Sequence, residues 1–188
     1  MRFLIFAWLL ATASAASSAL AQTPPTGPVV LTISGEIGQS NRGSLDKFAD
    51  KLPAGHGLTF ERAMAFDLTA LERIGMKTVT AKYDSWPAAY RFEGPLLKDV
   101  LAAAGVTEAR IVRPMALDGY TAEIPFTDLT AYPVILALKM DGKWLGIGEA
   151  GPSWVIYPRQ DFPALAKEDD AKWVWGVYHI QVEGKAAK

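Results

Sequence analysis

Apolar residues recur with two different periods along the chain, and these periods predict many strands and a few short helices. The best helical pattern opens at Gly94-Pro95, repeats apolar side chains at spacings of three and four, and stops at Gly105. Asp67 is the predicted N-cap of a second helix over residues 68–74, and Ser44 of a third over residues 44–52. Each predicted helix is short.

Alternating or β-branched runs predict the strands. Asp118-Gly119 and Asp141-Gly142 are typical hairpin turns between such runs. The predicted strands cover residues 29–33, 76–83, 110–117, 120–124, 133–140, 143–145, 153–157 and 173–182. Many strands, two hairpins and few helices favour the α+β class, with mixed sheets, over a doubly wound sheet.

The N-terminus has the three parts of a secretory signal peptide. Arg2 precedes an apolar run over residues 3–11, and small residues lead to Ala21, after which cleavage is expected. The run is shorter than the roughly 20 residues that a membrane span needs, and no later stretch is long and apolar enough. We therefore expect a signal peptide over residues 1–21, a flexible leader over 22–28 and one domain over 29–188.

The signal type indicates the export route. Without any cysteine the chain cannot carry a lipid on a lipobox cysteine, and without paired arginines it does not resemble a twin-arginine signal. The general secretory route delivers an unfolded chain. The expected location is therefore the periplasm or the medium.

Composition narrows the function classes. The formal net charge is −1 and no basic cluster is present, which argues against nucleic acid as a partner. The absence of cysteine excludes disulfides, thiol nucleophiles and thiolate metal ligands. His56 and His179 are the only histidines, too few for a three-histidine zinc site.

Several segments, in order, resemble the molybdopterin-binding domain of sulfite-oxidase-type enzymes. Phe92 to Leu101 with Ala104-Gly105 matches an aromatic-x-Gly-x-x-Leu-x-Asp-x-Leu…Ala-Gly segment. The further matches are Asp118-Gly119-Tyr120 through Ile124-Pro125, residues 133–137 with Met140-Asp141-Gly142, Gly151-Pro152 with residues 155–158, and residues 173–182. This resemblance implies the fold of that domain over nearly the whole exported chain.

One position departs from the family pattern. In the periplasmic methionine-sulfoxide-reductase branch, a cysteine precedes a tryptophan by four residues and a glycine follows eight later. Trp86 and Gly94 keep the second spacing, but Lys82 stands at the place of the cysteine. The family's cysteine gives its thiolate to molybdenum, and a protonated ammonium has no lone pair to offer.

The resemblance and this departure together favour a non-catalytic module that binds a small ligand or an envelope protein, without a cofactor. The candidate ligand-binding residues lie in or beside the resembling segments and carry polar groups: Lys82, Tyr83, Asp84, Trp86, Tyr120 and Arg159. Taken alone, each of them is better explained by core packing or solvation.

Two alternatives stay open. The chain could be an oxidoreductase that keeps molybdopterin without a cysteine ligand, held by backbone amides and by Arg42, Arg91 or Arg159. It could also be a hydrolase using Ser, His and Asp, although neither histidine lies in a nucleophile motif. Trp173 and Trp175 are predicted to share one strand face, as core residues or as a stacking surface.

Overall fold

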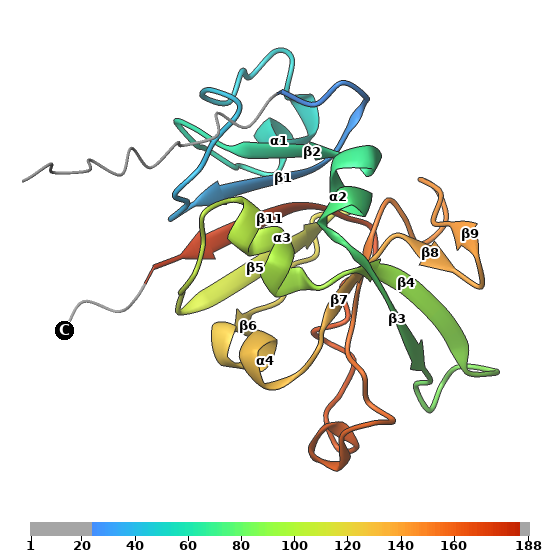
Figure 1. Cartoon of the computed structure of the whole chain (residues 1–188). Coiled ribbons are helices and arrows are strands. Elements are labelled where there is room, and N and C mark those ends of the chain that lie inside the picture. Colours follow the sequence, from blue (N-terminus) through green and yellow to red (C-terminus); the bar gives the residue numbers. More distant parts are fainter. Residues whose placement is uncertain (1–23, 185–188) are drawn as a thin grey trace, which may run out of the picture.

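Five strands form the largest sheet, in the order β2-β1-β11-β5-β6 (Figure 1). The strands are β1 (Val29–Gly35), β2 (Met64–Asp67), β5 (Ile111–Ala116), β6 (Ile124–Pro125) and β11 (Val177–Glu183). β1 and β11 run parallel and all other neighbours in this sheet are antiparallel. The computed structural model describes residues 24–184, so the expected signal peptide and the first two residues of the expected leader lie outside the described part.

Two smaller sheets adjoin the first. A four-stranded antiparallel sheet has the order β3-β4-β8-β9, and β10 pairs with β7 in the other. Figure 1 shows β3 and β4 extending away from the five-stranded sheet. The strands are β3 (Met76–Ala81), β4 (Tyr90–Pro95), β7 (Ile135–Ala137), β8 (Lys139–Met140), β9 (Lys143–Trp144) and β10 (Trp154–Ile156).

Short helices connect and cover the sheets. They are α1 (Lys51–Gly55), α2 (Leu68–Ile74), α3 (Leu97–Ala103), α4 (Phe126–Ala131) and a 3-10 turn η1 (Pro163–Leu165). α3 turns Leu97, Val100 and Leu101 into the core, where all three are fully buried. None of the helices within residues 24–184 has the length and apolar character needed to cross a bilayer.

The α+β prediction is confirmed, as is the cap of α2. The Asp67 carboxylate accepts the Ala70 N–H at 2.7 Å, and α2 covers the predicted residues 68–74. The other carboxylate oxygen of Asp67 accepts the backbone N–H groups of Thr26 and Gly27 at 3.0 and 2.8 Å. One side chain thus begins a helix and holds the segment that leads into β1.

Two helix predictions are wrong about where the helix begins. No helix covers residues 44–50, because the Asp46 carboxylate accepts the N–H groups of Phe48 and Ala49 and forms a turn, so α1 begins only at Lys51. Gly94-Pro95 does not open a helix either, since it ends β4 opposite Lys77 and Met76. A Cβ on Gly94 would lie 2.0 Å from the Leu136 carbonyl oxygen, so this glycine serves a close approach of β4 to β7.

Three strand predictions are also wrong in extent. Residues 133–140 are split, because 135–137 pair with β10 whereas 139–140 pair with β4. The return of the Asp118-Gly119 hairpin forms only a bridge, Met115 to Thr121, before β6. The last strand begins at Val177, so Trp173 and Trp175 do not share a strand face. The chain turns at Gly176, which has a φ of 65°.

Candidate functional site

An open cleft of about 670 Å³ lies where four connecting segments meet. These segments follow β3, β5, β9 and η1, and Trp154 of β10 and Ala116 of β5 complete the lining. The lining residues are Trp86, Ala116, Asp118, Tyr120, Glu149, Ala150, Trp154, Asp170, Ala171, Trp173, Val174 and Trp175. Its size falls in the range of small-molecule sites.

Aromatic rings form one wall of the cleft. The Trp86 ring packs edge-on against Trp154 and Trp173, with centroids 5.4 and 5.6 Å apart. The Trp154 ring is in turn 5.4 Å from that of Phe92, which is fully buried in β4. Edge-to-face contacts of this kind add to the burial of each ring. The wall is therefore anchored in the core before any ligand arrives.

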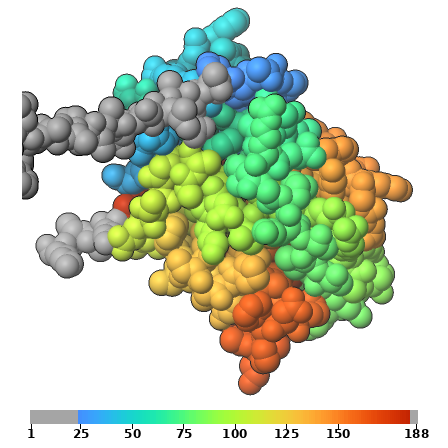
Figure 2. Space-filling model, viewed as in Figure 1, coloured from blue at the N-terminus to red at the C-terminus, as the bar shows by residue number. Residues whose placement is uncertain are grey.

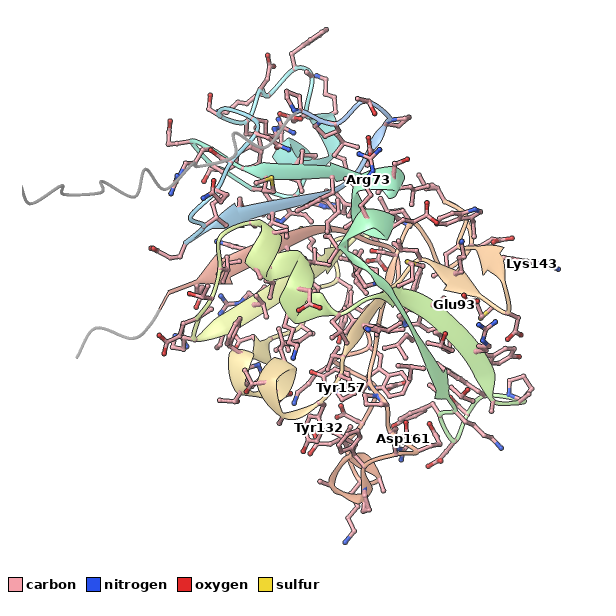
Figure 3. All side chains as sticks on the ribbon, in the orientation of Figure 1. Arg73, Glu93, Tyr132, Lys143, Tyr157 and Asp161 are labelled. Carbon is pink, nitrogen blue, oxygen red and sulfur yellow. The ribbon has the colours of Figure 1, made fainter. Side chains whose placement is uncertain are left out.

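Trp173 is fixed from behind by Tyr157, which is labelled in Figure 3. The two rings stack with centroids 6.3 Å apart, and Trp173 is only 6% exposed. The Tyr157 hydroxyl donates to the Asp128 carboxylate at 3.1 Å. Burial, and next the Asp128 charge, raise the pKa of Tyr157 well above its usual range, so this hydroxyl stays protonated and keeps donating.

The lining of the cleft also includes polar groups. Asp118 accepts the Tyr120 N–H at 2.9 Å, and the Tyr120 hydroxyl donates to the Ala171 carbonyl at 3.0 Å. This second bond ties the turn after β5 to the segment before β11. Asp118, Glu149 and Asp170 line the cleft and are all exposed.

The six candidate residues divide between the cleft and a second hollow. Trp86 and Tyr120 line the cleft. The other hollow, of about 470 Å³, is lined by Lys82, Asp84, Arg159, Gln160, Pro163 and Ala166. Tyr83 lies between them, because its ring contacts Trp173 on one side and the Arg159 guanidinium, at 4.6 Å, on the other.

The second hollow is held together by its own polar contacts. Gln160 accepts the Lys82 N–H at 3.1 Å and donates to the Lys82 carbonyl at 2.6 Å. Arg159 donates to the Ala166 carbonyl at 2.5 Å, and its other terminal nitrogen, which has no hydrogen-bond partner, lies 3.6 Å from the exposed carboxylate of Asp84. These contacts hold the segment after β10 against the end of β3. Figure 2 shows the segment after β10 in orange-red at the bottom of the molecule.

Of the twelve residues that line the cleft, the candidate set included only Trp86 and Tyr120. Trp154, Trp173 and Trp175 line it, together with the carboxylates Asp118, Glu149 and Asp170. The signal was present in the concentration of tryptophan between residues 144 and 175. Assigning Trp173 and Trp175 to one strand hid it, because the structure buries Trp173 but leaves Trp175 49% exposed.

The arginines proposed for pterin binding have separate partners. Arg42 pairs with Asp50 at 2.6 Å, Arg91 pairs with Glu93 at 3.1 Å, and Arg159 lines the second hollow. Neither these three nor any other lysine or arginine of the described chain lines the aromatic cleft. The cleft thus lacks the cationic groups that usually hold an anionic cofactor.

The histidines do not form a hydrolytic triad. His179 is fully buried and contacts the Ser34 hydroxyl through Nε2 at 3.0 Å, but its Nδ1 has no partner. Burial, and next the charge of Arg42, lower its pKa to about 4. His56 contacts the Tyr178 hydroxyl at 2.9 Å instead. A triad needs a carboxylate on the free nitrogen, and here the nearby charge is positive.

A family profile, the oxidoreductase molybdopterin binding domain, matches residues 30–183. The chain belongs to this family. Its fold is similar to that of the sulfane dehydrogenase SoxCD from Paracoccus pantotrophus, with a TM-score of 0.57 and 18% identity. The similarity covers 84% of this chain and 38% of that one, so this family member spans well under half of the larger chain. No curated protein matches this family member.

The residues present do not fit the family's cofactor in two respects. The chain has no cysteine to supply the thiolate, and Lys82, the residue that the resemblance places there, turns toward the second hollow. Among residues 24–184 no group of three His, Asp or Glu side chains offers an alternative metal site. A molybdopterin phosphate in the aromatic cleft would face carboxylates without a compensating cation.

Proposed function

We propose that this family member is an exported, non-catalytic module that binds a small molecule in the aromatic cleft. The observation that carries the proposal is the preformed wall of Trp86, Trp154 and Trp173 beside an open volume of about 670 Å³. Rings held in place by the core lose little conformational freedom on binding, which favours affinity for a planar or alkylated ligand.

The proposal includes the location of the protein and the absence of molybdopterin. The signal peptide expected at residues 1–21 supports export by the general secretory route, and therefore folding outside the cytoplasm. Cofactor insertion before export would require a folded chain in the cytoplasm. The expected route and the missing thiolate are independent arguments for a module that works without molybdopterin.

Family membership favours one competing function, a molybdopterin-dependent oxidoreductase. Such a protein would need a metal ligand other than cysteine and cations for the phosphate. Arg159 is the best placed of the proposed arginines, since it lines a hollow together with Lys82. The two functions differ in the molecule that is isolated with the protein, which is a small ligand without molybdenum for the binding module and molybdopterin for the oxidoreductase.

Native mass spectrometry of the protein recovered from its host tests the proposal. The wild type should carry a small ligand and no molybdenum. Trp175→Ala should lose this ligand, because Trp175 lines the cleft, and its 49% exposure means that the substitution removes little core packing. Trp144→Ala is the matched control, since Trp144 is 44% exposed and lies outside the cleft. Equal ligand on all three proteins would contradict the proposed site.

A further inference from the structure

The charged groups that line the cleft all have one sign. Asp118, Glu149 and Asp170 line it and are exposed, and no lysine, arginine or histidine lines it. Within residues 24–184 none of these three carboxylates forms an ion pair. The cleft therefore has negative charge that the protein itself leaves uncompensated.

Neighbouring cations are engaged elsewhere. Lys172, which directly precedes Trp173, is paired with Asp128 at 3.0 Å and with Glu168 at 3.8 Å. Lys139 lies 4.0 Å from the ring centre of Trp144, outside the cleft. Lys143 points outward at the edge of the four-stranded sheet (Figure 3). A cation for the cleft must therefore come from solution.

The aromatic wall suits the same kind of ligand. The face of a tryptophan or tyrosine ring is electron-rich and attracts cations, and tryptophan does so most strongly. Trp175 and Tyr120, which also line the cleft, are each 49% exposed, and Asp118 lies two residues from Tyr120 in the chain. Rings take up the alkyl groups of an ammonium ion while the carboxylates balance its charge.

We propose that the ligand is a small organic cation whose ammonium group carries alkyl substituents. This inference rests on the proposed function and specifies its ligand. An anion would be repelled by three carboxylates. A bare metal ion is disfavoured, because no three His, Asp or Glu side chains of the described residues lie close enough to hold one.

Two probes of the same shape separate the effect of charge on binding affinity from the effect of shape. Choline and 3,3-dimethylbutan-1-ol differ only in the quaternary atom, nitrogen in one and carbon in the other. Tryptophan fluorescence of the mature protein is titrated with each, and with benzyltrimethylammonium as a larger cation. Choline should bind roughly tenfold more tightly than its neutral isostere, and added salt should reduce the difference.

Removing the three carboxylate charges should remove the preference for choline over its neutral isostere. In the variant Asp118→Asn, Glu149→Gln, Asp170→Asn, each amide keeps an acceptor oxygen, so the bond from the Tyr120 N–H to residue 118 persists. Choline and the isostere should then bind about equally. The control variant Glu61→Gln with Asp161→Asn removes two exposed carboxylates outside the cleft and should keep the preference.

Each contrary outcome overturns the inference. Equal binding of choline and its isostere by the wild type, tighter binding of a neutral disaccharide than of both cations, or no response to either cation would do so. The first two would leave the proposed function standing, because the cleft would still bind a small molecule. If no probe binds, the comparison of Trp175→Ala with Trp144→Ala in native mass spectrometry decides the proposed function separately.

Discussion

The Trp154 indole donates through Nε1 to the backbone carbonyl of Trp173 at 2.8 Å. This bond links β10 to the segment before β11, beside the backbone hydrogen bond from the Val155 N–H to the Val174 carbonyl at 2.9 Å. It therefore positions two rings of the cleft wall relative to each other. A cleft formed by loops acquires the rigidity of the sheets through contacts of this kind.

Trp154→Phe tests this link. Phenylalanine keeps a ring beside Trp86 and Phe92 but removes the donor, so the Trp173 carbonyl loses its partner. We expect the free energy of unfolding to fall by about 1–3 kcal/mol, measured by urea denaturation. Trp144→Phe, at an exposed site, should change it by less than about 0.5 kcal/mol. Equal losses for the two variants would show that the hydrogen bond is unimportant.

Gly94→Ala probes the approach of β4 to β7. A methyl group there would lie 2.0 Å from the Leu136 carbonyl oxygen. Because this oxygen belongs to the backbone, no side-chain rotation relieves the contact. We expect a loss of about 3 kcal/mol or more, or failure to fold. Gly43→Ala is the control, because nothing lies within 4 Å of its added Cβ. A Gly94→Ala protein with wild-type urea midpoint would contradict the register of these strands.

Asp67→Ala removes the N-cap of α2 together with the acceptor for Thr26 and Gly27. The cap alone accounts for about 1 kcal/mol, so the measured loss of unfolding free energy should exceed this value. The backbone N–H of Gly27, and then that of Ala70, lower the pKa of Asp67. Its contribution is therefore complete above the unfolded pKa and is lost as the pH falls through the folded one.

Asp46→Ala serves as comparison, since Asp46 also accepts two backbone N–H groups but in an exposed turn. It should cost less stability than Asp67→Ala. If urea denaturation gives the two variants equal losses, the attachment of residues 26–27 to Asp67 contributes nothing.

His179 should make stability depend on pH. Its pKa of about 4 in the folded protein is below the usual 6.5. Between these values the unfolded chain binds a proton that the folded one does not, so stability falls as the pH is lowered from 7 toward 4. The loss should reach about 3 kcal/mol. Urea denaturation at several pH values should show a weaker dependence of the unfolding free energy on pH for His179→Gln than for the wild type. Parallel curves for the two proteins would contradict this assignment.

Local chemistry made part of the fold predictable. Asp67 and Gly75 delimit α2 through interactions within a few residues, so the sequence shows them directly. Gly94-Pro95 was misassigned because its role depends on Leu136, more than forty residues away. The start of the last strand just after Gly176 likewise depends on backbone hydrogen bonds of Gly176 with Ala150 and Leu117.

The site was predictable only where the family resemblance marked it. Trp86 and Tyr120 lie in resembling segments and line the cleft. Lys82, Asp84 and Arg159 also lie in or beside resembling segments, but they line the second hollow instead. Glu149 and Asp170 carry no sequence signal of their own, and Asp118 is marked only as a turn residue, because what the three share is an opening that only folding creates.

Molybdenum analysis of the protein isolated from its own host tests the central claim most directly. The measurement is the ratio of molybdenum to polypeptide by plasma mass spectrometry, with a cysteine-bearing member of the family produced in the same host as the positive control. The account predicts stoichiometric metal in the control and background metal in this protein. Stoichiometric molybdenum in this protein, with pterin released on denaturation, would contradict it.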